Sequence, residues 1–195
     1  AGGGAEALAV DVAGVERARE AIEAAGPFDV LVNNAGTARH APFTEVTLED
    51  YDLVMDLNVR AAFFVAQAVA KGLIDAGRPG SIINVSSQMG HVGGEKRTVY
   101  CATKHALEGL TKAMAVELAP HRIRVNTLGP TFVRTAMTAP FFEDPWFQAT
   151  MLPRIQLGRV AEVEDLMGAV VFLASDASSM VTGTALLVDG GWTAV

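Results

Sequence analysis

Short apolar runs rich in valine and isoleucine alternate with longer helical patterns along this chain. No other feature constrains the fold as strongly. The strand-like runs are EALAVDV, FDVLVNNAG, GSIINVSS, IRVNTLGP and TALLVDGG, at residues 6–12, 28–36, 80–87, 123–130 and 184–191. Strands separated by helices of ten or more residues predict a parallel sheet with helices on both faces. The sequence therefore predicts an α/β fold with a doubly wound sheet, in which ligands bind at the carboxyl ends of the strands.

The stretches between these runs have helical apolar spacing and clear end signals. They cover residues 14–26, 47–77, 98–120 and 162–175. Thr47 is predicted to cap the second helix, which ends at Gly77, and Pro120 ends the third. The chain contains no linker, repeat or low-complexity stretch, so we predict one domain over residues 1–195. Residues 136–157, rich in proline and aromatic side chains, are expected to form a mobile excursion.

Composition excludes several classes of partner. The chain of 195 residues has a formal net charge of −7 and no basic stripe, which argues against nucleic acid. The most apolar run, AAFFVAQAVA, is interrupted by Gln67, followed by Lys71, and is too short to span a bilayer. A single cysteine cannot form an internal disulfide, so we expect a reducing, cytoplasmic location.

A tyrosine and a lysine lie one helical turn apart in the helix predicted over residues 98–120. A phenol is a poor base at neutral pH, but a nearby ammonium group favours its ionised form. Tyr100 with Lys104 four positions later could therefore exchange a proton with an alcohol oxygen. Ser87, at a strand end, could hold that oxygen. Taken alone, such a pair is also common on helix surfaces, and that alternative stays open at this point.

A second pair on the same helix suggests different chemistry. Cys101 and His105 are also four positions apart, as a thiol nucleophile and its base could be. Cys101 lies about 100° around the helix from Tyr100, so both pairs cannot face the same strand end. A lone helical cysteine is more often a small buried side chain. We expect no metal site, because the histidines are scattered without ligand spacing, at His40, His91, His105 and His121.

Several short motifs occur in a fixed order along the chain. They are NNAG at 33–36, LNV around Asn58, NVSS ending at Ser87, YCATK from Tyr100, VNTLGPTFVRT at 125–135 and VTGTALLVDGG at 181–191. In combination, and over nearly the whole chain, they resemble the short-chain dehydrogenase/reductase family. The resemblance implies a Rossmann-like sheet and an oxidoreductase that uses NAD or NADP.

The resemblance also implies roles for four residues. Tyr100 matches the general acid/base, and Lys104 matches the residue that lowers the tyrosine pKa and bonds the nicotinamide ribose. Ser87 matches the donor to the substrate oxygen. Asn58 matches the asparagine whose backbone holds a water in a proton relay. Because the cofactor carries only a hydride, the protein must supply this proton path.

Further positions match cofactor-binding residues of the family. Asn34, Ala35 and Gly36 match the loop beside the adenosine half, where small residues allow close approach. Asp11 matches the aspartate that contacts adenine, although capping of the following helix is an equal alternative. Pro130, Val133 and Thr135 match the turn at the nicotinamide end. The family usually has Pro-Gly where this chain has Pro130 followed by Thr131, whose side chain could narrow that end or touch substrate.

One family element has no counterpart in the sequence. The glycine-rich turn that holds the pyrophosphate follows the first strand, whereas AGGG at residues 1–4 precedes one. We therefore expect the first β-α-β unit, with the residue that selects NAD or NADP, to lie before Ala1. A catalytically inert fragment or binding remnant is the alternative function.

The sequence gives weaker indications of substrate and assembly. Three residues between Tyr100 and Lys104 match alcohol and carbonyl chemistry rather than enoyl reduction. The stretch LGPTFVRTAMTAPFFEDP resembles members that oxidise sugar acids or polyols. A sugar-nucleotide epimerase is disfavoured by the VDGG end and the lack of an added substrate domain. Relatives form tetramers through the two long helices, so we expect a homotetramer. The side chains that could contact substrate or close over it are Gln88, His91, Glu95, Arg97, Trp146 and Phe147.

Overall fold

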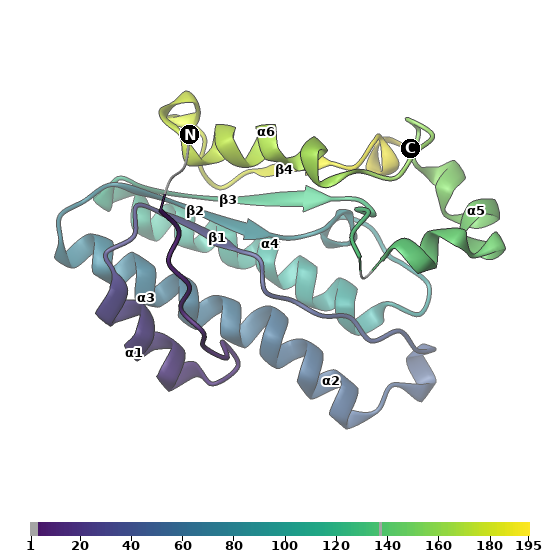
Figure 1. Ribbon diagram of the computed structural model, residues 1–195, viewed down its shortest axis with the longest axis horizontal. Coiled ribbons are helices and arrows are strands. Elements are labelled where there is room, and N and C mark those ends of the chain that lie inside the picture. Colours follow the sequence, from purple (N-terminus) through teal and green to yellow (C-terminus); the bar gives the residue numbers. More distant parts are fainter. Residues whose placement is uncertain (1–3, 137) are drawn as a thin grey trace.

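The computed structural model describes residues 4–136 and 138–195 and has an α/β architecture (Figure 1). Its sheet has four parallel strands in chain order: β1 (Val30–Asn33), β2 (Gly80–Val85), β3 (Ile123–Pro130) and β4 (Ala185–Val188). The register aligns Asn33 with Asn84 and Val85 with Leu128, so the carboxyl ends of β1, β2 and β3 meet at one edge. The predicted parallel sheet is confirmed.

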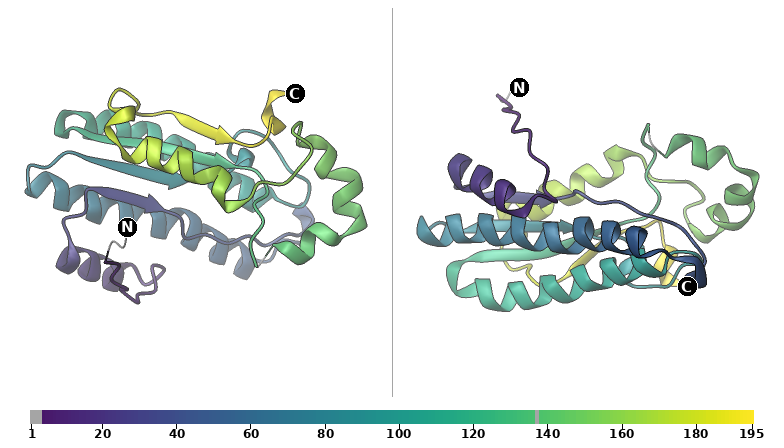
Figure 2. Two further views of the ribbon diagram at one scale, coloured as in Figure 1. Left: turned by 45° about the horizontal axis from the view of Figure 1, so that its top comes forward. Right: turned by 90° about the horizontal axis from the view of Figure 1, so that it is seen from below.

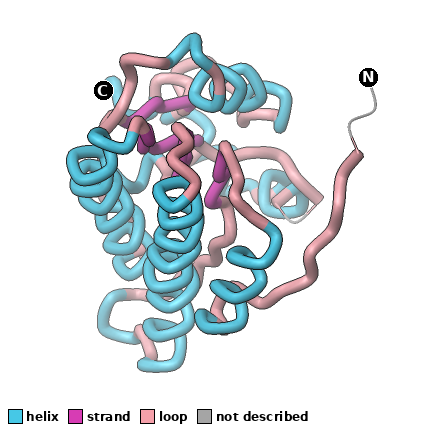
Figure 3. The backbone as a smooth tube through the Cα atoms, turned by 90° about the vertical axis from the view of Figure 1, so that its left-hand side faces the viewer, coloured by secondary structure: helices cyan, strands magenta, loops and turns pink. Residues whose placement is uncertain are grey.

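Helices cover both faces of this sheet. Those described are α1 (Val15–Ala25), α2 (Leu48–Met55), α3 (Ala62–Asp75), α4 (Thr98–Leu118), α5 (Pro145–Thr150) and α6 (Val163–Ala174). Helices α1, α3 and α4 lie on one side, and α6 lies on the other (Figures 1 and 2). Viewed from the side in Figure 3, the strands lie between these two layers.

The helix ends follow the predicted chemistry. The Thr47 hydroxyl accepts a hydrogen bond from the Asp50 amide at 3.1 Å, as an N-cap should. Helices α2 and α3 are continuous through a π-helical turn at Asp56–Ala61. The chain leaves α3 at Gly77, whose φ of +63° is in the left-handed region that glycine tolerates best.

The largest core cluster lies between the sheet and the helices α3 and α4. Its members are apolar side chains from both helices and from β2 and β3: Ala66, Val69, Ala70, Leu73, Ile82, Ala115, Ile123 and Val125. By length and composition alone, Leu48–Asp75 could also cross a membrane, although the shorter run AAFFVAQAVA suggested otherwise. Such a helix is weak evidence for a membrane span, because core helices pass the same test.

One strand prediction near the start of the chain was wrong. Residues 6–12 form no strand, and Leu8 is 55% exposed. The strand predicted within residues 28–36 is present as β1, but its Val30 and Val32 are 38% and 41% exposed. An apolar run becomes a strand only where a neighbour satisfies its backbone groups. Among the described residues nothing pairs with the free edge of β1. Most of AGGG, Ala1–Gly3, lies outside these residues.

The excursion predicted over residues 136–157 is mostly helical. It contains α5 between 3₁₀ turns at Ala139–Glu143 and Leu152–Arg154, while Met137 lies outside the described residues. Phe147 is fully buried, and its ring centre lies 5.0 Å from that of Phe132. Aromatic packing therefore joins this segment to a core cluster in which Phe147 lies with Met89, Cys101 and Trp192, whereas Trp146 remains exposed.

Candidate active site

The end of β2 and the start of α4 bring a serine and a tyrosine to one edge of the sheet. Ser87 lies two residues beyond β2 and caps the 3₁₀ turn Gln88–Gly90, its Oγ accepting a hydrogen bond from the Met89 amide at 3.1 Å. That bond leaves the Ser87 hydroxyl hydrogen free to donate. Tyr100 lies in the first turn of α4 and is partly buried.

Lys104 lies one turn further along α4 and is buried against the same strand end. Its Nζ donates a hydrogen bond to the Val85 carbonyl at 2.8 Å and lies 5.6 Å from the centre of the Tyr100 ring. Val85 is the last residue of β2. The structure therefore brings together Ser87, Tyr100 and Lys104, three residues that are distributed over two elements of the sequence.

Burial changes the acidity of both titratable groups. It lowers the pKa of Lys104 to about 8, an effect that the negative charge of Glu108 opposes. Burial also raises the pKa of the Tyr100 phenol, against the hydrogen-bonding effect of Ser87 and the positive charge of Arg97. The sequence led us to expect a lowered tyrosine pKa. The difference has a physical cause, because the phenol is desolvated and the ammonium of Lys104 is bonded to a carbonyl.

Asn58 lies in the π-helical turn and ties three segments together. Its Oδ1 accepts a hydrogen bond from the Thr37 amide at 2.8 Å. Its Nδ2 donates to the Thr37 carbonyl at 2.9 Å and to the Thr103 hydroxyl at 3.1 Å. Asn58 thus fixes the loop after β1 against the helix that carries Tyr100.

The loop Asn34–Gly36 follows β1 and is exposed at the same edge. A Cβ at Gly36 would lie 3.2 Å from Asn58 Oδ1, so a side chain there would press on this contact. Asn33, just before the loop, was not singled out from the sequence. It is buried and donates to the Ala62 carbonyl at 2.8 Å and to Asn84 Oδ1 at 3.2 Å.

The turn after β3 carries the other predicted cofactor residues. Pro130 ends the strand, and Val133 forms an isolated bridge with Ala161. The Thr135 hydroxyl is 3.0 Å from that of Thr138 within a local turn. Thr131 is buried, and its hydroxyl has no hydrogen-bond partner among the described residues.

The remaining predicted substrate contacts differ in environment. Gln88 is buried, with an Oε1 that lacks a partner in the described part of the chain. Glu95 is exposed on the loop before α4. His91 lies with its Nε2 3.3 Å from Oε1 of Glu108.

The cysteine and histidine pair does not form a nucleophile with its base. His105 Nδ1 lies 2.9 Å from the Cys101 carbonyl oxygen, so the contact is to the backbone and not to the thiol. Cys101 belongs to the aromatic cluster with Phe147 and Trp192. Burial raises the pKa of the Cys101 thiol, which disfavours the thiolate that a nucleophile needs.

Comparison with known proteins places this architecture in a family. A sequence profile described as "Enoyl-(Acyl carrier protein) reductase" matches residues 1–193. L-xylulose reductase of Bos taurus is 51% identical over 191 residues, which are 98% of this chain and 78% of that protein. The chain belongs to the short-chain dehydrogenase/reductase family.

Solved structures of family members agree with the fold. A structure described as a "putative NAD(P) dependent gluconate 5-dehydrogenase" from Beutenbergia cavernae, with NADP bound at low occupancy, has a TM-score of 0.94 and 41% identity; the match covers all of this chain and 79% of that one. A gluconate 5-dehydrogenase from Burkholderia cenocepacia, in complex with NADP and tartrate, has a TM-score of 0.90 and 38% identity over 95% and 74% of the two chains. The Rossmann-like fold and an oxidoreductase acting on CH–OH groups are confirmed. The expected cofactor, NAD or NADP, agrees with these structures.

Asp11, which matches the adenine-contacting aspartate of the family, makes a local hydrogen bond in this structure. The Asp11 carboxylate is exposed and accepts a hydrogen bond from the Ala13 amide at 3.0 Å. It therefore closes a turn before α1. The N-cap residue of α1 is Gly14, and the helix has no side-chain cap hydrogen bond, so Asp11 does not cap the helix itself. The hollow beside it is lined by residues of α1 and by Arg60, not by Tyr100 or Ser87.

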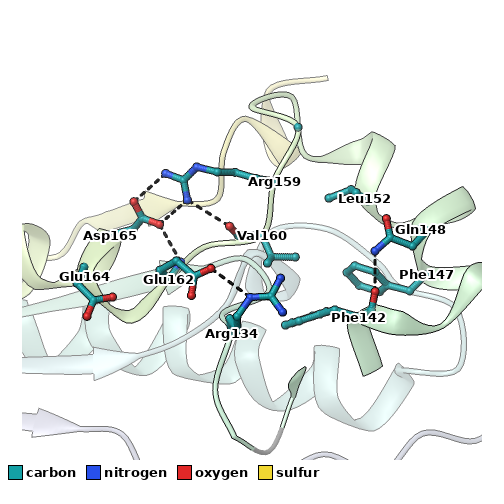
Figure 4. A pocket seen from close by; sticks show the side chains of 11 residues that line it. Arg134, Phe142, Phe147, Gln148, Leu152, Arg159, Val160, Glu162, Glu164 and Asp165 are labelled. Carbon is teal, nitrogen blue, oxygen red and sulfur yellow. Dashed lines mark hydrogen bonds and ion pairs between the residues drawn. The ribbon is translucent and has the colours of Figure 1, made fainter. Parts of the chain in front are cut away.

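Sequence reasoning also missed a hollow of about 540 Å³ between α5 and the start of α6 (Figure 4). Its two arginines are already paired: Arg134 with Glu162 at 3.1 Å, and Arg159 with Asp165 at 2.6 Å. None of Ser87, Tyr100 and Lys104 lines it. The hollow is therefore separate from the residues that the sequence predicts for catalysis.

Proposed function

We propose that this chain interconverts a secondary alcohol and a ketone with NAD or NADP. The substrate is a sugar acid, a polyol or another small hydroxy or keto compound. The observation that carries the proposal is the cluster of Ser87, Tyr100 and Lys104 where β2 meets α4. The names of the relatives, xylulose reductase and gluconate dehydrogenase, support this substrate range.

Two residues act on the substrate oxygen. The Ser87 hydroxyl donates a hydrogen bond to it, since its own lone pair is engaged by the Met89 amide. The Tyr100 phenol gives a proton to that oxygen in ketone reduction, and the phenolate removes the proton in alcohol oxidation. Because burial raises the pKa of the phenol, Tyr100 is mainly protonated at neutral pH, which suits reduction.

Lys104 and Asn58 support the proton transfer. With a pKa of about 8, Lys104 is mostly charged at neutral pH. One of its protons is bonded to the Val85 carbonyl, so two remain for the cofactor ribose and for a proton relay. Asn58 lies in a π-helical turn, where the regular carbonyl pairing of the helix is interrupted and a carbonyl can serve that relay.

The strand ends offer groups suited to a nicotinamide cofactor. The unpaired buried Thr131 hydroxyl and the exposed small-residue loop after β1 provide free donors and close backbone access. The residues that would hold the cofactor are Asp11, Asn34, Ala35, Gly36, Tyr100, Lys104, Pro130, Val133 and Thr135. When bound, the cofactor accepts or supplies the hydride. Asp11 would have to give up its bond to the Ala13 amide for this role.

The outer faces of α3 and α4 form an apolar groove that fits self-association. Phe63, Leu110 and Met114 line it, with Lys71 and Glu117 at its polar margin. We further propose that the subunit is a single domain, that four subunits form a homotetramer through this groove, and that the protein is cytoplasmic. The apolar groove and the single buried cysteine support these points.

Replacing Tyr100 by phenylalanine tests the function. In protein expressed from the complete gene, Tyr100→Phe should lower kcat by about 10²-fold or more, because it removes the proton donor and keeps the ring. Titration with NADH or NADPH should show that the variant still binds the cofactor, because the other cofactor-binding residues are unchanged. Tyr51→Phe, on the exposed side of α2, is the matched control and should retain full turnover. Turnover close to that of the unmodified protein in Tyr100→Phe would refute the proposed role.

A further inference from the structure

Arg97 is a cation close to the proposed acid/base, and its surroundings set it apart from the other arginines. It precedes α4 directly, three residues before Tyr100 and seven before Lys104. Arg97 is the N-cap residue of α4, with a non-helical φ of −128° and ψ of 22°. It is close enough to Tyr100 for its positive charge to act on the phenol.

The contacts of Arg97 place its guanidinium over the edge of the sheet where the strands end. The guanidinium carbon lies 5.4 Å from the centre of the Phe132 ring. Phe132 belongs to the turn after β3, next to the buried hydroxyl of Thr131. The guanidinium thus joins the start of α4 to the turn after β3.

The guanidinium of Arg97 has no acidic partner in the part of the chain that the structure describes. Six other arginines form ion pairs, and Arg97 is not among them. Arg124 is likewise half-buried, but it donates hydrogen bonds to the carbonyls of Leu173, Val181 and Ser175. No side-chain hydrogen bond engages Arg97 in the described residues. Five donors on a partly desolvated cation are therefore available to a ligand.

The titratable groups around Arg97 do not neutralise it. Burial lowers the pKa of Arg97, and the nearby Tyr100 and Cys101 side chains oppose that shift. His40, on the loop after β1, has its pKa lowered by burial and by the charge of Arg97, so it is neutral at pH 7. Lys104, further along α4, adds a second positive charge. A half-buried cation that lacks a counter-ion is costly unless a ligand supplies one.

We propose that Arg97 binds the carboxylate of the substrate, so that the preferred substrate is an anionic hydroxy or keto acid rather than a neutral polyol or ketose. This inference rests on the proposed function and narrows its substrate class. A guanidinium matches a carboxylate through two parallel N–H···O bonds, and its geometry is fixed here by stacking on Phe132.

Substrate pairs that differ only at the carboxylate test the inference. D-gluconate and D-glucitol share their hydroxyl stereochemistry, and D-xylonate and xylitol form a second pair. With protein expressed from the complete gene and with NAD or NADP, we expect kcat/KM for the acid to exceed that for the alditol about 10- to 100-fold, as charged hydrogen bonds allow. Arg97→Met should abolish this ratio, and Arg97→Lys should retain part of it.

A matched control and a binding measurement separate the possible outcomes. Arg154→Met removes another guanidinium stacked on an aromatic ring, that of Trp192, and should leave the ratio unchanged. Calorimetric titration with D-gluconate should show binding that Arg97→Met weakens about tenfold or more. Equal use of acids and alditols, or a ratio unaffected by Arg97→Met, would overturn the inference and leave the function standing. Activity that Tyr100→Phe does not reduce would instead overturn the function, and the gluconate titration would still decide the role of Arg97.

Discussion

The two faces of the sheet are covered by helices that differ in how far their apolar side chains are buried. Helix α3 buries half of its length, including Leu73, which is fully inaccessible. Helix α6 has only Leu173 buried, while Met167 and Val171 are 58% and 64% exposed. Among the described residues, the face covered by α3 is therefore a well-packed core, whereas α6 exposes an apolar stripe that includes Met167 and Val171. The candidate site lies on the same side of the sheet as α3, because Tyr100 and Lys104 belong to α4.

The largest effect expected from this difference in burial is on stability. Leu73→Ala should lower the free energy of unfolding by about 2–5 kcal/mol, because it leaves a cavity in a dense core. Met167→Ala, at the exposed stripe of α6, should change it by less than about 0.5 kcal/mol. Urea unfolding of both variants measures the difference. An equal cost for the two substitutions would show that the stripe of α6 is covered in solution, and the contrast between the faces would fail.

A smaller effect, on activity, is predicted for the charge of Glu108, which lies beside Lys104 on α4. Glu108 is buried on α4, accepts a hydrogen bond from the Thr127 hydroxyl at 2.9 Å and faces Lys104 and His91. Its charge favours the protonated lysine, whose pKa of about 8 places the loss of that proton just above neutral pH. Glu108→Gln removes the charge, so the lysine pKa falls further and activity should decline at a lower pH.

The pH profile of kcat/KM checks this expectation. We expect the alkaline limb to move to lower pH, and kcat/KM at pH 8 to fall on the order of tenfold. Glu117→Gln removes an equal charge from the exposed far end of α4 and should leave the limb in place. A limb that stays fixed in Glu108→Gln, or moves upward, would contradict the role assigned to this carboxylate.

The smallest effect is expected for the cysteine. Cys101→Ala should retain most activity, because the thiol packs into the aromatic cluster and does not contact His105. Stability should fall by about 1 kcal/mol for the lost packing. Steady-state kinetics and thermal melting measure both quantities. Complete loss of turnover in a folded variant, with thiol labelling that substrate blocks, would restore the nucleophile hypothesis.

The sequence predicted those parts of the fold that depend on local signals. Thr47 as a cap, Gly77 at a left-handed helix end and the strand that ends at Pro130 all follow from residue type and spacing. The strand predicted over residues 6–12 failed because strand formation depends on a partner, which local sequence does not reveal. The same limit explains why β1 is more exposed than its apolar run suggested.

The site was predictable in composition but not in electrostatics. The order of Asn58, Ser87, Tyr100 and Lys104 indicated the cluster, and the structure places the last three together. The raised pKa of Tyr100 was not predictable, since it depends on desolvation in three dimensions. Neither was the burial of Glu108, because an acidic residue on a helix pattern usually faces water.

The π-helical turn at Asp56–Ala61 acts as a one-residue insertion in an otherwise regular helix. Each helical residue rotates the chain by about 100°, so the extra residue changes the phase between α2 and α3. Helix α3 can then keep its apolar side on the sheet while Asn58 points toward Thr37 and Thr103. Deleting a single residue from this turn would restore regular winding and rotate α2 away from its neighbours. Chain length in this turn, and not only side-chain identity, therefore determines where Asn58 lies in the candidate site.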